Sequence, residues 1–144
     1  MFIGEYVHTI DVKKRLAIPA KFRKEISPRG VLTRGLDACL FLYPVKTWEG
    51  LAEKLGNLPV GQAGTRSFIR LLLSGAADAE FDALGRILVP DYLKKYADLK
   101  KRVVLVGVGN RIEIWDELRW NEYKVKTEQS ADEIAERLGE LGIY

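Results

Sequence analysis

Residues 11–19 read DVKKRLAIP, and residues 82–90, 71 positions later, read DALGRILVP. Both segments contain an aspartate, an arginine four residues later, a short run of mostly branched apolar residues and a final proline. A segment that recurs in this way indicates that the chain is built from two copies of one structural unit.

The similarity extends beyond these two segments. Val31–Gly35 matches Val103–Gly107 at an offset of 72, and Trp48 falls on Trp120 at the same offset. One extra residue between the matched blocks explains the change of offset. The series predicts two repeats, at residues 5–47 and 76–119. A helical connector at 48–75 joins them, and a helical tail follows at 120–144.

Each repeat contains the same local signals. In the first, Tyr6–Ile10 is rich in β-formers and leads through a polar turn into Arg15–Ile18, which predicts a β-hairpin. Pro19 cannot continue a central strand but can open a helix, and Phe22 and Ile26 give that helix one apolar face. A second hairpin is expected around Gly35, and its counterpart in the second repeat around Gly107–Asn110.

The connector and the tail are predicted to be helical. Thr65–Ser74 clusters Phe68, Leu71 and Leu72, with Gly75 as the C-cap. In the tail, Ser130 and Glu133 have the spacing of a capping box. The apolar residues of that helix form a stripe too narrow for a separate core, so both apolar clusters are expected to contact other subunits: Ile134, Leu138 and Leu141 in the tail and Phe68, Leu71 and Leu72 in the connector.

Composition describes an ordinary globular chain. The 144 residues are 47% hydrophobic and 30% charged, with a net charge of +3. Residues 1–50 carry nine bases against five acids, whereas residues 125–144 carry two bases against five acids. No membrane span or signal segment is predicted, and the single cysteine, Cys39, fits a reducing cytoplasm.

Two units this small are expected to interlock. Each lies near the lower size limit for independent folding, so pairing them about a pseudo-two-fold axis would bury both apolar faces in one barrel. The predicted fold class is therefore α+β, mainly β with short helices, plus a C-terminal helix.

The repeated motif resembles that of the MraZ family, bacterial regulators built of two tandem SpoVT/AbrB-like halves. Asp11, Lys13, Arg15, Leu16, Ile18 and Pro19 match the family signature, whereas Lys14 stands where the family usually has glycine. The second copy keeps Gly85 and Arg86 but has Leu84 in place of the motif lysine. The resemblance implies a double-psi β-barrel-like fold, closed ring oligomers, a nucleoid-associated cytoplasmic protein, and binding to short DNA repeats upstream of a cell-division and cell-wall operon.

The chemistry of the motif agrees with that role. A loop carrying Lys13, Lys14 and Arg15 places three positive charges close together, with Lys suited to phosphates and Arg to a bidentate pair with guanine. Asp11 can orient Arg15, and Asp82 can orient Arg86. The alternative is that these Asp–Arg pairs only close their turns. The acids upstream of Arg86 favour a weaker role in DNA binding for the second loop.

Other candidate sites are weaker. His8 is the only histidine, and Cys39 lies in an apolar run typical of a buried, inert thiol. Asp78, Glu80 and Asp82 alternate like the solvated face of a strand, and Trp48 and Trp120 are expected to anchor the core. The sequence thus predicts no metal site, no cofactor and no small-molecule substrate.

Three classes of function remain. A sequence-specific DNA-binding transcriptional regulator is favoured. The alternative is a protein-interaction module on the same barrel, antitoxin-like or an adaptor, for which the Lys13–Arg15 loop would be dispensable. An enzyme is not expected, because the sequence offers no acid–base or nucleophile constellation.

Overall fold

The structure, a computed structural model, describes residues 1–144. Its strands are β1 (Phe2–Thr9), β2 (Arg15–Ala17), β3 (Arg29–Arg34), β4 (Leu40–Pro44), β5 (Ala77–Glu80), β6 (Arg86–Leu88), β7 (Arg102–Gly109) and β8 (Ile112–Asp116). Its helices are α1 (Ala20–Ile26), α2 (Val45–Gly56), α3 (Ala63–Ser74), α4 (Asp91–Tyr96), α5 (Glu117–Gln129) and α6 (Ala131–Glu140). None of these helices is both long and apolar enough to cross a membrane. The predicted α+β class is confirmed.

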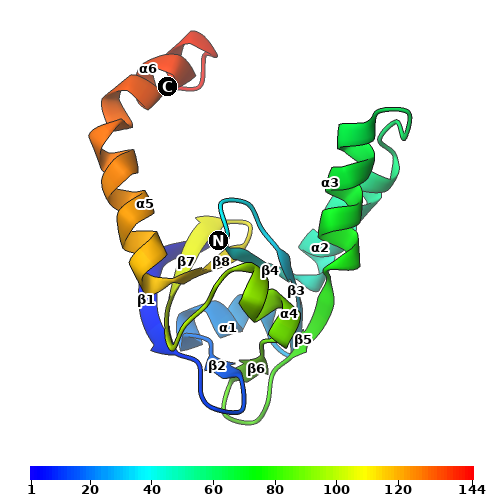
Figure 1. The fold of residues 1–144 in the computed structure, drawn as a ribbon, viewed down its shortest axis with the longest axis vertical. Coiled ribbons are helices and arrows are strands. Elements are labelled where there is room, and N and C mark those ends of the chain that lie inside the picture. Colours follow the sequence, from blue (N-terminus) through cyan, green and yellow to red (C-terminus); the bar gives the residue numbers. More distant parts are fainter.

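The two repeats exchange strands, as the interlocking prediction required. A six-stranded antiparallel sheet has the order β1-β7-β8-β4-β3-β5, so each edge strand pairs with a strand of the other repeat. The remaining strands, β2 and β6, pair with each other in a two-stranded ribbon at one end of the body (Figure 1). The expected hairpin between Tyr6–Ile10 and Arg15–Ile18 is therefore wrong: one bridge, Ile10 to Leu16, is all that joins them. The backbone of β2 pairs instead with its counterpart in the second repeat.

The strand registers locate the pseudo-two-fold axis. In the ribbon, Leu16 lies opposite Ile87, its own counterpart in the other repeat. In the sheet, Phe41 of β4 lies opposite Glu113 of β8, which again are equivalent positions. The axis therefore passes through the centre of the ribbon and the centre of the sheet, and it relates the two motif turns.

One matched block is shifted by a residue. Val31 pairs with Tyr43, and Val104 pairs with Trp115, so β3 and β7 correspond at an offset of 73. The alignment of Val31–Gly35 with Val103–Gly107 at 72 was thus wrong by one position. Runs of valine and leucine resemble each other at several offsets, and only the strand partners identify the correct one.

The sheet is buried on both faces. On one face a cluster of 19 buried residues includes Leu16, Phe22, Ile87 and Leu93, and it packs under α1 and α4. On the other face a smaller cluster contains Trp115 and packs against Trp48 and Trp120. Both tryptophans contribute to packing, as predicted.

Two helical arms project from the body on the side away from the ribbon (Figure 1). One is the α2–α3 hairpin, which ends at the predicted C-cap, Gly75. The other is α5 followed almost directly by α6. The capping box expected at Ser130 is wrong, since Ser130 makes no side-chain cap hydrogen bond and its φ of −106° and ψ of 5° continue from α5. With Ser130 ending one helix and beginning the next, its backbone cannot adopt the extended N-cap conformation.

Candidate nucleic-acid interface

The two motif turns have the same internal geometry. Asp11 Oδ1 accepts hydrogen bonds from the backbone N–H groups of Lys13 and Arg15, both at 2.9 Å, while Asp11 Oδ2 accepts from Arg15 Nε at 2.9 Å. In the second turn Asp82 Oδ1 accepts from the backbone of Leu84 and Arg86, and Asp82 Oδ2 accepts from Arg86 Nε at 2.8 Å. Each aspartate thus builds its turn and fixes the direction of its arginine.

These hydrogen bonds favour the ionised carboxylates. The backbone N–H of Arg15 is the largest cause that lowers the pKa of Asp11, and the backbone N–H of Arg86 acts in the same way on the pKa of Asp82. Both carboxylates are therefore negatively charged at neutral pH and hold their arginines as ion pairs.

Lys14 adopts the backbone conformation that the family signature reserves for glycine. Its φ is 65°, and the φ of the equivalent Gly85 is 75°. The N–H of Lys14 donates to the Asp11 carbonyl at 2.9 Å, and the N–H of Gly85 donates to the Asp82 carbonyl at 3.0 Å. The tight turn is preserved, although the left-handed backbone region is energetically unfavourable for a residue with a Cβ.

The structure brings all six predicted site residues to one end of the molecule. The turn between β1 and β2 lies beside the turn between β5 and β6 (Figure 1). Across their contact, Ile18 N–H donates to the Gly85 carbonyl at 3.1 Å and Val89 N–H donates to the Lys14 carbonyl at 2.8 Å. Arg86 Nη1 also approaches Asp11 Oδ2 at 3.9 Å, so Asp11 faces the arginines of both repeats.

The positive charges of the first loop are not equally available. Lys14 Nζ pairs with Asp91 Oδ2 at 2.6 Å, and Arg15 pairs with Asp11. Lys13 is exposed and forms no ion pair. The three positive charges expected close together are all in this loop, but they differ in pairing: Lys13 is unpaired, whereas carboxylates hold Lys14 and Arg15.

Sequence reasoning missed three lysines that lie next to the first turn. An open groove of about 700 Å³ is lined by Thr9, Ile10, Asp11, Val12, Lys94, Leu99, Lys100 and Lys101. Lys100 pairs with Asp98, whereas Lys94 and Lys101 form no ion pair. The backbone explains this proximity, because Ile10 N–H donates to the Lys101 carbonyl at 2.9 Å. The lysine pairs 94–95 and 100–101 are visible in the sequence, but no local signal connects them to the first loop.

The second turn has no such set of neighbouring lysines. Phe81 N–H donates to the Pro28 carbonyl at 3.0 Å, so Ser27 and Pro28 occupy the positions that Lys100 and Lys101 hold beside the first turn. Arg23 covers Gly85 so closely that a Cβ there would lie 2.5 Å from Arg23 Nη1. Asp78 and Glu80 are exposed on the edge strand β5. The second turn thus has one neighbouring cation, Arg23, in place of the three lysines beside the first turn, and two exposed carboxylates on the adjacent strand.

The two other candidate residues, Cys39 and His8, lie in buried or partly buried positions. Cys39 is fully buried, its Sγ lies 3.1 Å from the Leu36 carbonyl, and burial strongly raises the pKa of its thiol. This environment confirms the prediction of a buried, inert thiol. Partial burial lowers the pKa of His8.

Known proteins resemble the chain over its full length. The family model described as "MraZ protein, putative antitoxin-like" matches it twice, at residues 1–71 and 72–140. A protein named transcriptional regulator MraZ from Halothermothrix orenii is 49% identical over 143 residues, covering 99% of this chain and 100% of the relative. A protein of the same name from Lactobacillus delbrueckii subsp. bulgaricus is 50% identical over 141 residues, covering 98% of this chain and 99% of the relative.

Proposed function

Since this chain belongs to the MraZ family, whose relatives are named transcriptional regulators, we propose that it regulates transcription by binding double-stranded promoter DNA through its first motif loop. Several copies would present this loop together, as a closed ring, to short repeats upstream of a cell-division and cell-wall operon. Such a protein would act in the cytoplasm, associated with the nucleoid.

The observation that supports this proposal is the concentration of positive charge around the first turn. Lys13, Lys94 and Lys101 are free of ion pairs, and they surround an arginine that Asp11 holds in a fixed direction. Neutralisation of phosphates by lysine supplies affinity that does not depend on sequence, while contacts to base edges supply specificity.

Arg15 is suited to read a base. Asp11 accepts from its Nε, and the guanidinium makes no other hydrogen bond in the structure. The two terminal nitrogens are therefore free to donate to O6 and N7 of a guanine in the major groove. Arg86 has the same pair with Asp82, but its Nη1 also faces Asp11, and no free lysine borders its turn.

A ring would convert weak contacts into tight binding. One basic loop per subunit offers few phosphate contacts, but linked loops act at a high effective concentration, which can raise affinity by ~10²–10⁴. This argument requires repeats whose spacing matches the spacing of the loops.

The test compares the two arginines in matched gel shifts with DNA from upstream of the protein's own operon. Arg15→Ala is expected to abolish specific binding, with a loss of ~1–3 kcal/mol at each engaged subunit. Arg86→Ala is expected to cost clearly less, and size-exclusion profiles should be unchanged in both variants. An equal loss at both sites would show that the second loop also faces DNA.

The same experiment distinguishes the DNA-binding function from the alternative, a protein-interaction module. A protein-interaction module without DNA contact predicts that neither arginine, nor Lys13, affects any DNA shift, and that wild-type protein retards no fragment of the promoter. A variant that loses its assembly would instead assign the Asp–Arg pairs a structural role only.

A further inference from the structure

The tip of the first motif turn carries an apolar side chain that nothing in the protein covers. Val12 is 98% exposed, which is more than any other large apolar side chain of the chain. The next most exposed, Tyr144 and Met1, are the two ends of the chain. Val12 therefore contributes nothing to the packing of the body, and water surrounds almost all of its apolar surface.

The geometry of the turn does not require a valine at this position. Lys14 N–H donates to the Asp11 carbonyl at 2.9 Å, so Val12 and Lys13 are the two central residues of a four-residue turn. Such positions usually hold Gly, Pro, Asn, Asp or Ser, which favour a turn through their backbone preferences or their own hydrogen bonds. Valine offers neither, and the second turn has Ala83 at the equivalent place. The side chain of Val12 is thus available for contact with another molecule.

The hydrogen bonds of the turn hold Val12 at a fixed place relative to Arg15. Asp11 N–H donates to the Arg15 carbonyl at 3.0 Å, and Asp11 Oδ1 accepts from the backbone N–H groups of Lys13 and Arg15. The backbone is therefore fixed on both sides of the valine, and rotation about χ1 is restricted in a β-branched side chain. A base contact by Arg15 would consequently bring the methyl groups of Val12 to a neighbouring base pair.

Unpaired lysines border the valine. Val12 lines the groove that also contains Lys94 and Lys101, and Lys13 follows it in the turn. Phosphates that meet these lysines lie along the edges of a DNA groove, with the base edges between them. An apolar side chain at the tip of this turn would therefore face base edges when DNA is bound.

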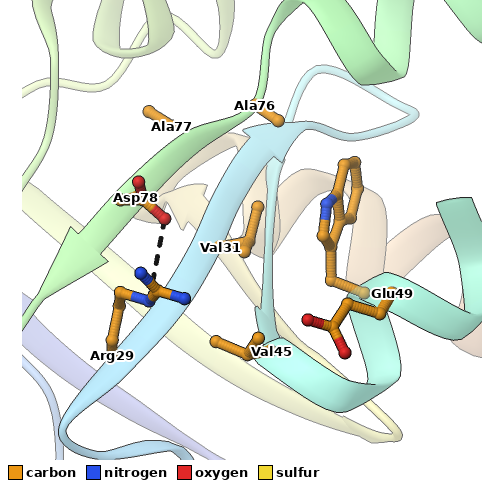
Figure 2. A pocket seen from close by; sticks show the side chains of 8 residues that line it. Arg29, Val31, Val45, Glu49, Ala76, Ala77 and Asp78 are labelled. Carbon is orange, nitrogen blue, oxygen red and sulfur yellow. Dashed lines mark ion pairs between the residues drawn. The ribbon is translucent and has the colours of Figure 1, made fainter.

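The groove beside Trp48 lacks this combination of apolar surface and free cations. Arg29 Nε lies there 3.8 Å from Asp78 Oδ1, and Glu49 adds a second carboxylate (Figure 2). Two carboxylates repel phosphate, so this part of the surface is not suited to DNA. The apolar surface of Val12, by contrast, has unpaired lysines around it.

We propose that Val12 recognises a thymine next to the guanine that Arg15 contacts. In the major groove thymine presents its C5-methyl group, which cytosine lacks. Contact between this methyl group and Val12 would remove both from water and favour thymine at that position. The inference rests on the proposed function, and it adds a second recognised base to the one assigned to Arg15.

The first experiment removes only the methyl groups of the thymines. Deoxyuridine replaces thymidine throughout the repeats of the promoter fragment, which keeps base pairing and every hydrogen-bonding group. In gel-shift titrations, wild-type protein should bind the modified fragment about fourfold more weakly at each engaged repeat, the ratio expected for burying one methyl group. Val12→Ser should bind the unmodified fragment with a similar loss and show no further loss on the modified one.

Two further variants are the controls. Val60→Ser, at an exposed valine between α2 and α3, should remain as sensitive to the modification as wild-type protein. Val12→Thr keeps one methyl group and should keep part of the sensitivity. Because Val12 does not contribute to packing, its variants should have the thermal unfolding midpoint of the wild type. Equal sensitivity in wild-type and Val12→Ser protein, or none in either, would overturn the proposal.

Arg15→Ala distinguishes failure of this inference from failure of the proposed function. If Arg15→Ala loses specific binding but the modified DNA binds wild-type protein normally, the valine contact is overturned and the proposed function stands. Wild-type protein that binds neither fragment would overturn both. Single deoxyuridine substitutions then locate the thymine, which should lie next to the guanine whose recognition depends on Arg15. A sensitive thymine remote from that guanine would also overturn the proposal, because the turn holds the two side chains together.

Discussion

At the residue scale, each motif depends on one carboxylate. Asp11 accepts three hydrogen bonds from its own turn, two from backbone N–H groups and one from Arg15. A carboxylate is needed because it offers acceptors toward the backbone and the guanidinium at the same time. The turn and the direction of the arginine are consequently one structural feature, and the two readings of the Asp–Arg pair do not exclude each other.

The pH dependence of the turns follows from these contacts. The folded-state pKa of both Asp11 and Asp82 is lowered, so each contributes stability that is present above the carboxyl's ordinary pKa and is lost as pH falls through the lowered value. We expect carboxyl resonances of both residues to titrate below the ordinary aspartate range in an NMR titration. Asp11→Asn should remove the low-pH transition of the first turn and leave that of Asp82. A normal pKa at Asp11 would contradict the geometry.

Introducing glycine into the first turn and removing it from the second should have opposite effects on the stability of the protein. Lys14→Gly removes a left-handed strain of ~1–2 kcal/mol but also the exposed pair with Asp91, worth about 0–1 kcal/mol, so stability should stay equal or rise slightly. Gly85→Ala should destabilise, because φ is 75° and the new Cβ would lie 2.5 Å from Arg23 Nη1. Urea unfolding of the two variants measures both effects. Loss of stability in Lys14→Gly would mean that the Lys14–Asp91 pair contributes more than an exposed ion pair usually does.

At the element scale, the exchanged strands make each repeat dependent on the other. β1 pairs with β7, β5 pairs with β3, and neither β2 nor β6 has a ribbon partner within its own repeat. Leu16 and Ile87 meet at the centre of the ribbon and are both almost completely buried. The ribbon therefore holds the two motif turns against each other.

This dependence predicts that separated halves do not fold. Residues 1–75 and 76–144 should each lack a β-sheet signal in circular dichroism, and an equimolar mixture should recover it. In the intact chain, Leu16→Ala should cost about 2–5 kcal/mol because it leaves a cavity on the pseudo-two-fold axis. Leu36→Ala, at a half-exposed loop residue, is the control and should cost far less. A folded first half would show that the exchanged strands are not required.

At the scale of the whole molecule, the distribution of charge matters more than its total. The net charge is only +3, yet three unpaired lysines from two distant segments surround one turn. The acidic tail lies on the arm that points away from this end (Figure 1). The fold thus separates a basic end from an acidic arm within a nearly neutral chain.

Salt dependence measures how many of these lysines meet phosphate. Each neutralised phosphate contributes about −0.9 to the slope of log K against log salt. Lys13→Ala and Lys101→Ala should each flatten the slope by roughly that amount and leave the preferred repeat unchanged. Lys46→Ala, an exposed lysine on α2, should have no effect. A change of base preference in either loop variant would reverse the division of roles between lysine and arginine.

The sequence by itself determined the features that depend on neighbouring residues. The Asp–Arg spacing predicted both motif turns, Pro19 and Pro90 precede helices as expected, and the hairpins β3–β4 and β7–β8 follow from turn residues between apolar runs. The repeat, with each unit near the lower size limit for independent folding, indicated two interlocked units. These features arise from backbone preferences and apolar periodicity, which act over a few residues.

Only the tertiary structure decided the features that depend on distant partners. It paired β2 with β6 instead of β1, shifted the correspondence of β3 and β7 by one residue, and brought Lys94 and Lys101 to a turn some eighty residues earlier. It also placed Glu5 against Trp120, 115 residues later, with Glu5 Oε2 accepting a hydrogen bond from Trp120 Nε1. Burial and hydrogen bonding over the whole sheet determine which strands pair, so the pairing cannot be predicted from the local sequence.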